Sequence, residues 1–217
     1  MNERAKRLTE KTSYTMNDLR EIMELLRAED GCPWDREQTH QSIRRDLIEE
    51  TYEVVEGIDK DDAAILREEL GDLMLQVVFH ARIAEEAGRF DLDDVADGIC
   101  RKLILRHPHI FGNVVAETAD EVLKNWDAIK KVEKNQKNPK EVLDAVSHAL
   151  PALIRADKIC GKAKKLGTAP IAPAKIDPDT VGETLLAIVA AAKEAGVDCE
   201  KALSDTLDAY ISAVPEE

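Results

Sequence analysis

Residues 42–86, SIRRDLIEETYEVVEGIDKDDAAILREELGDLMLQVVFHARIAEE, decide the fold of this 217-residue chain. The first part predicts a helix over about residues 42–58, because its apolar side chains recur at helical spacing along one stripe. These side chains are Ile43, Leu47, Val54 and Ile58. A second helix is predicted over about residues 62–86, and beyond Leu73 it is apolar almost all round, as expected of a central helix. The connection at 59–62 is so short that the two helices are expected to be antiparallel neighbours.

The rest of the chain is also predicted to be helical. Aromatic residues make up only 4% of it, while Ala, Leu, Glu and Lys are abundant, which favours helices over a sheet. Further helices are expected over about residues 15–26, 93–106, 118–138 and 151–165, with two more after residue 180. The segments GCPWDREQTH, 31–40, and HPHIFGN, 107–113, are expected to be loops. The predicted fold class is all-α, an antiparallel helical bundle.

Charge limits the classes of partner. Acidic residues outnumber basic ones by 44 to 30, which gives a net charge of −14. This charge repels a nucleic-acid backbone and an anionic membrane surface, so polymeric nucleic acid and membranes are not expected as partners. A small anionic substrate can still bind where metal ions and local Lys or Arg side chains overcome the negative field.

The cysteines and the N-terminal segment indicate a cytoplasmic protein. The four cysteines form no Cys-x-x-Cys pair, so neither a zinc knuckle nor a disulfide framework is predicted. The polar N-terminal segment contains no hydrophobic signal core, and no apolar run approaches the ~20 residues that a membrane span needs.

Acidic residues are concentrated in the fold-deciding stretch. Between Asp46 and Asp72 there are eleven of them and only two basic residues, Lys60 and Arg67. So much like charge is costly unless solvent or cations compensate it. One interpretation is a solvated acidic face, which is common on Glu-rich surface helices. A di-iron carboxylate bundle would need Glu-x-x-His on two helices, and only Glu37–His40 has that spacing.

The positions of the carboxylates favour a site for cations. Glu50 and Glu53 lie about 60° apart around the helix axis, on the flank of the apolar stripe. Glu69 and Asp72 repeat this three-residue offset on the next helix. Antiparallel packing can bring the two pairs face to face, and such oxygen ligands suit Mg²⁺ or Mn²⁺.

Two acidic motifs of the sequence resemble those of a known family. EETYE at 49–53 and EELGD at 68–72 look like the EExxE…ExxD signature of the MazG family of all-α nucleotide pyrophosphohydrolases. Further stretches that resemble this family are GCPWDREQTH, LGDLMLQVVFHARIAEEAGRF, RHPHIFG, EVLKNWDAIK and LPALIRADKI. Together they cover roughly residues 16 to 160.

The resemblance implies metal-dependent hydrolysis of nucleoside triphosphates, NTP or dNTP, to the monophosphate and pyrophosphate. It implies that magnesium, or manganese, is held by Glu50, Glu53, Glu69 and Asp72. Glu49 is a further candidate for metal contact or for activation of water. Homodimers built as four-helix bundles are also implied, so that a second copy of the chain completes the fold.

Three residues outside the carboxylate signature are implied to bind the nucleotide. Lys102 and Arg106 would contact the phosphates, and Trp126 would lie near the bound nucleotide. Lys and Arg one helical turn apart do offer the local positive charge that the chain otherwise lacks. The alternatives are a basic helix end that complements the helix dipole, and core packing for the tryptophan.

The C-terminal part departs from the family pattern. Longer members carry two such domains, and we predict one domain over 1–139 and a degenerate second region over 140–217, with a proline-rich linker at 168–179. Laying residues 181–193 on 70–82 places Thr180 opposite Glu69 and Glu183 opposite Asp72. The second region therefore cannot hold the same metal site.

Two alternative functions stay open at this stage. The chain could be a nucleotide-binding or regulatory module that has lost hydrolysis, since its second half is degenerate. It could also be a related pyrophosphatase that acts on phosphoribosyl-ATP, although the GCPWD and RHPHIFG segments favour the first family. Retention of all five signature carboxylates favours a working enzyme, because clustered negative charge is costly to keep without a use.

Overall fold

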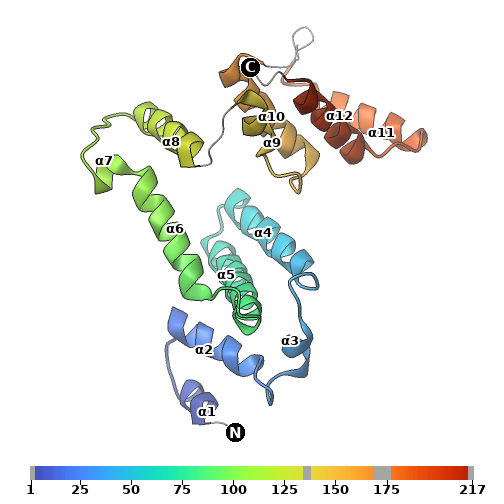
Figure 1. The fold of residues 1–217 in the computed structure, drawn as a ribbon. Helices are drawn as coiled ribbons and strands as arrows, with labels where there is room; N and C mark the ends of the chain where they lie inside the picture. Colours follow the sequence, from blue (N-terminus) through green and yellow to red (C-terminus); the bar gives the residue numbers. More distant parts are fainter. Residues whose placement is uncertain (1–2, 134–137, 169–176, 215–217) are drawn as a thin grey trace. The chain divides into compact units, whose positions relative to one another are not determined.

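The structure is a computed structural model that describes residues 3–133, 138–168 and 177–214. All secondary-structure elements in these ranges are helices (Figure 1), so the predicted all-α class is confirmed. No helix among the described residues combines the length and the apolar character that crossing a membrane requires. The chain forms two compact units, Met1–Leu105 and Arg106–Glu217, which are described separately below. The predicted domain boundary at residue 139 stays a prediction.

The first unit contains the fold-deciding helix pair. Its helices are α1 (Glu3–Thr9), α2 (Met16–Leu26), α3 (Pro33–Glu37), α4 (Arg44–Asp59), α5 (Ala63–Glu86) and α6 (Leu92–Arg106). The expectation of a loop over 31–40 was wrong in part, because Pro33 at the first turn starts the short α3. α4 begins two residues later than predicted, since Ser42 forms its own turn with Thr39 through two backbone-to-hydroxyl hydrogen bonds.

A tight turn joins α4 and α5. Asp62 caps α5 by accepting hydrogen bonds from the backbone N–H groups of Ala64 and Ile65 at 2.9 and 3.2 Å. Gly57, buried near the end of α4, allows the two backbones to approach closely: a Cβ placed there would lie 2.9 Å from the Cα of Leu66. The predicted packing of these two helices as neighbours is confirmed.

The core of the first unit lies where α2 packs against α5. It consists of Met23, Ile43, Val78, Phe79 and Ile83. Thr15 and Asp18 form a capping box at the start of α2.

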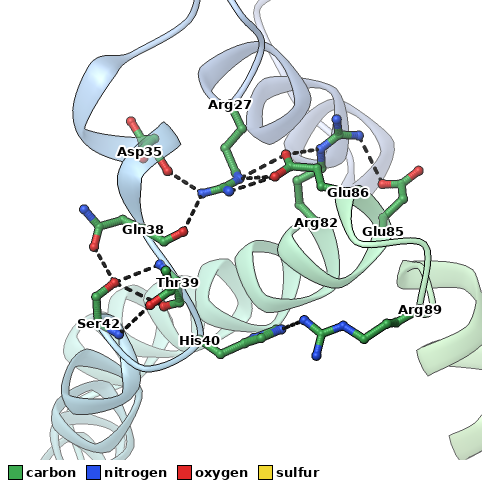
Figure 2. Close-up of polar contacts among 10 residues, drawn as sticks. All are labelled: Arg27, Asp35, Gln38, Thr39, His40, Ser42, Arg82, Glu85, Glu86 and Arg89. Atoms are coloured by element: carbon green, nitrogen blue, oxygen red, sulfur yellow. Dashed lines mark hydrogen bonds and ion pairs between the residues drawn. The ribbon is translucent and has the colours of Figure 1, made fainter.

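A buried arginine ties the segment before α4 to α5. The Arg27 side chain is only 6% exposed, and its guanidinium pairs with Glu86 at 2.7 Å. It also donates to the backbone carbonyls of Asp35 and Gln38, as Figure 2 shows. Bonds to charged groups are stronger than neutral ones, so Arg27 holds the 31–40 segment in place.

The second unit is a separate helical cluster. Its helices are α7 (Pro108–Phe111), α8 (Ala119–Glu133), α9 (Pro139–Asp144), α10 (Ala152–Leu166), α11 (Val181–Glu194) and α12 (Cys199–Ala213). Its core consists of Leu143, Val146, Ile159, Ala163, Leu207, Ile211 and Val214. Inside it the fully buried Arg155 pairs with Asp208 at 2.6 Å.

Two predictions for the second unit were wrong in detail. The 107–113 segment is not wholly a loop, because Pro108 starts the short helix α7. The helix predicted over 118–138 was expected to end at Asn138. Asn138 instead lies at the start of a separate helix, because its side chain accepts a hydrogen bond from the backbone N–H of Glu141 and caps α9. The two predicted helices after residue 180 are confirmed as α11 and α12. Most of the predicted linker at 168–179 lies outside the described residues.

Candidate metal centre

Three carboxylates from α4 and α5 converge at one place. Ligand oxygens of Glu50, Glu69 and Asp72 all lie within 4.8 Å of one another. The close approach of Gly57 to Leu66 explains this meeting. Because α4 and α5 are antiparallel, the residue seven before Gly57 is level with the residue seven after Leu66. Glu50 is therefore level with Leu73, which directly follows Asp72. Within the described ranges, no other group of three or more metal-ligating side chains comes together in this way.

The other two signature carboxylates occupy different positions. Glu53 acts on the three electrostatically, since its charge helps to raise the pKa of both Glu50 and Glu69. Glu49 is exposed on α4 and is not among the three side chains that meet. The structure therefore brings ligand oxygens of three of the five predicted carboxylates together, with Glu53 as an electrostatic neighbour, and the roles of all five stay predictions.

The electrostatics of the cluster favour a bound cation. Burial, followed by the charges of Glu53, Asp72 and Glu69, raises the pKa of Glu50 above its ordinary value. Burial, followed by Glu53, likewise raises the pKa of Glu69. Oxygen ligands without cysteine or histidine suit Mg²⁺ or Mn²⁺, so the side chains present fit such an ion.

These pKa shifts predict how a cation affects stability. A carboxyl whose pKa is raised by folding contributes stability below its unfolded pKa, and this contribution is lost as the pH rises through the folded value. A divalent cation that replaces the protons offsets the loss. We therefore expect Mg²⁺ to raise the melting temperature more at pH 8 than at pH 5. Equal shifts at both pH values, or the same shifts in Glu69→Gln, would contradict a carboxylate site.

The predicted nucleotide-binding residues lie on α6 and α8. Lys102 is exposed on α6. Arg106, at the end of α6, is largely buried, pairs with Glu133 at 2.8 Å, and lies 6.0 Å from the ring centroid of Trp126. The structure thus brings Arg106 and Trp126 together within the second unit. Their contact with a nucleotide stays a prediction.

His40 and His80 form a pair that the sequence patterns did not predict. Their Nδ1 atoms lie 2.8 Å apart in nearly parallel rings. On the other side of His40, Nη2 of Arg89 lies 2.9 Å from its Nε2, as Figure 2 shows. A guanidinium can only donate, so His40 accepts at Nε2 and carries its proton on Nδ1, which donates to Nδ1 of His80. His80 therefore carries its proton on Nε2, a buried nitrogen that has no partner among the described residues.

This pair predicts a loss of stability in mild acid. Burial, followed by the neighbouring His40, lowers the pKa of His80 below its ordinary value of 6.5. The unfolded chain takes up this proton first, so the free energy of unfolding falls as the pH drops from 6.5 toward the folded pKa. In urea denaturation at pH 7.5 and 5.5, His80→Leu should lose this part of the pH dependence. His148→Leu, which removes an exposed histidine, should keep it; equal behaviour of the two variants would contradict the assignment.

Comparison with known proteins identifies a family. A family model described as the MazG nucleotide pyrophosphohydrolase domain matches residues 38–111, which include the whole of α4 and α5. The chain is 48% identical over 147 residues to the nucleoside triphosphate pyrophosphohydrolase of Escherichia coli (strain K12), across 67% of this chain and 56% of that protein.

Two further relatives extend this match. Identity is 44% over 150 residues to the nucleoside triphosphate pyrophosphohydrolase/pyrophosphatase MazG of Thermotoga maritima, across 69% of this chain and 57% of that protein. It is 40% over 199 residues to an uncharacterized 26.1 kDa protein of Streptomyces cacaoi, across 91% of this chain and 80% of that protein. The chain thus spans little more than half the length of the two named pyrophosphohydrolases.

Proposed function

Because this chain belongs to the MazG nucleotide pyrophosphohydrolase family, we propose that it hydrolyses nucleoside triphosphates to the monophosphate and pyrophosphate with the help of a divalent cation. Its substrates are ribo- or deoxyribonucleoside triphosphates, and its cation is Mg²⁺ or Mn²⁺. The observation that carries the proposal is the convergence of Glu50, Glu69 and Asp72 within 4.8 Å on the paired helices. The relatives' names support the same reaction class.

The carboxylates have two roles in the proposed site, cation binding and activation of water. Glu50, Glu53, Glu69 and Asp72 hold the cation, which when bound neutralises the triphosphate and polarises the attacked phosphorus. Glu50 and Glu69 are only half-buried, so solvent and metal can both reach their carboxylates. Glu49, the exposed residue that precedes Glu50 on α4, orients the attacking water and accepts its proton.

Residues of α6 and α8 receive the remaining parts of the substrate. Lys102 and Arg106 bind phosphate oxygens, for which Arg106 exchanges its partner Glu133 for the substrate. Trp126, already close to the guanidinium, lies near the nucleotide. The sequence has no G-x-x-x-x-G-K-[ST] loop, which favours attack at the α-phosphorus over release of the γ-phosphate.

Pyrophosphate release from a panel of NTPs and dNTPs tests this proposal. Release that requires Mg²⁺ or Mn²⁺ is the expected result. A chain that binds nucleotide and releases pyrophosphate from none of them would instead be a binding or regulatory module.

We also propose that the protein is a homodimer. The α4–α5 pair, which lies side by side in Figure 1, exposes large apolar side chains. These are Ile48, Tyr52, Val55, Ile58, Leu70, Met74 and Val77. On each helix most of them recur every three or four residues, which places them on one face, and a second copy of the pair covering these faces would complete a four-helix bundle.

A charge on this apolar surface is expected to separate the dimer. Met74→Glu would place a carboxylate in the interface without a partner, so its mass in sedimentation equilibrium should be that of one chain. Val115→Glu adds the same charge at a residue that is 80% exposed in the second unit, and it should keep the wild-type mass. A wild-type protein that is monomeric at micromolar concentration would contradict the proposed dimer.

A further inference from the structure

The amide of Gln76 is a buried group that the proposed function leaves unexplained. Gln76 is only 7% exposed, and its Oε1 is without solvent contact or a hydrogen-bond partner in the described part of the chain. A buried acceptor without a donor costs free energy, and in native proteins such a group usually marks a water, an ion or a functional role.

Helical spacing places Gln76 on the same face of α5 as Asp72. It follows Asp72 by one helical turn, and long side chains in a helix lean from their own Cα toward the preceding turn. The amide therefore extends over the turn that carries Asp72. Across the interface Glu50 is level with Leu73, so the Gln76 amide and the Glu50 carboxylate approach the same place from two helices.

The nearby hydrogen-bond donor of His80 does not bond to the Gln76 amide. His80 lies one turn further along α5 and offers the Nε2–H group that its pairing with His40 fixes. Both Oε1 of Gln76 and Nε2 of His80 are unsatisfied, so the two do not bond to each other. His80 therefore leaves the Oε1 acceptor of Gln76 unoccupied.

We propose that Gln76 is a positioning residue of the metal centre, whose Oε1 accepts a hydrogen bond from a water ligand of the cation held by Glu50, Glu69 and Asp72. This inference rests on the proposed cation. Mg²⁺ dehydrates reluctantly and keeps several water ligands, each of which has protons to donate. A neutral amide accepts such a bond without adding negative charge to a cluster that is already crowded with carboxylates.

Mn²⁺ binding to the full chain without nucleotide tests this role. Free Mn²⁺ is followed by electron paramagnetic resonance, so the readout does not depend on activity. Gln76→Met keeps the shape of the side chain and removes the acceptor, and the Kd for Mn²⁺ should rise about 10–100-fold, as for other residues behind metal ligands. Gln76→Glu keeps an acceptor oxygen and adds a charge, so it should bind Mn²⁺ at least as tightly as wild type.

A control and three further outcomes complete the test. Val78→Ala opens a cavity in the adjacent core, and it should lower the melting temperature with no change in the Kd.

An unchanged Kd in Gln76→Met, or equal weakening in Gln76→Glu, would overturn the inference and leave an internal water as the partner of the amide. A wild-type chain that binds no Mn²⁺ would overturn both the inference and the proposed cation. Tight binding weakened by Gln76→Met, without any pyrophosphate release, would support the inference and reject only the activity.

Discussion

Glu53→Gln and Asp72→Asn are each expected to reduce pyrophosphate release by more than about 100-fold, which exceeds the 10–100-fold loss typical of residues behind metal ligands. Each substitution is nearly isosteric and removes one negative charge from the place where α4 and α5 meet. Loss of like-charge repulsion should leave the stability of the metal-free protein unchanged or higher. Activity and stability are therefore expected to change independently.

Glu56→Gln is the matched control for these variants. Glu56 lies on α4 one turn beyond Glu53, but its side chain is exposed and pairs with Lys60. The substitution makes the same change of charge on the same helix and should keep wild-type turnover, because an exposed pair of this kind contributes little. Wild-type turnover in Glu53→Gln and Asp72→Asn would reject the carboxylate site, and a loss of turnover in Glu56→Gln would show that charge alone is responsible.

Gly57→Ala is expected to destabilise the protein by about 1–3 kcal/mol, the usual cost of overpacking a well-packed contact. The new Cβ would lie 2.9 Å from the Cα and N atoms of Leu66, and backbone atoms cannot rotate away as a side chain can. Relief requires α4 and α5 to move apart, and these are the helices that carry the carboxylates. Mn²⁺ binding should therefore weaken together with stability.

Gly71→Ala is the control on the facing helix. A Cβ at Gly71 meets no atom within 4 Å, so this substitution should stabilise α5 by about 0.5–1 kcal/mol through the lower entropy of the unfolded chain. Urea denaturation and Mn²⁺ titration of both variants check the two expectations. Equal stability of Gly57→Ala and Gly71→Ala would contradict a tight contact between the helices at Gly57.

Local patterns predicted most of the helices. The limits of α5 followed from Asp62, which caps its first turn, and from the turn-forming Gly88 beyond its end. Shorter elements were missed: α1 and α9 were not predicted, and α3 and α7 were expected to be loop. These helices have seven residues or fewer, so they contain too few turns for an apolar period to be recognised.

The sequence by itself determined the helical class, the family and the two carboxylate pairs, because a three-residue offset on a helix is a local property. Only the tertiary structure decided that Glu50, Glu69 and Asp72 meet and that Glu49 stays exposed. It also revealed the unpaired Oε1 of Gln76 and the contact of His40 with His80, forty residues apart. Such contacts depend on how whole helices pack, and the spacing of residues within a single helix does not encode that packing.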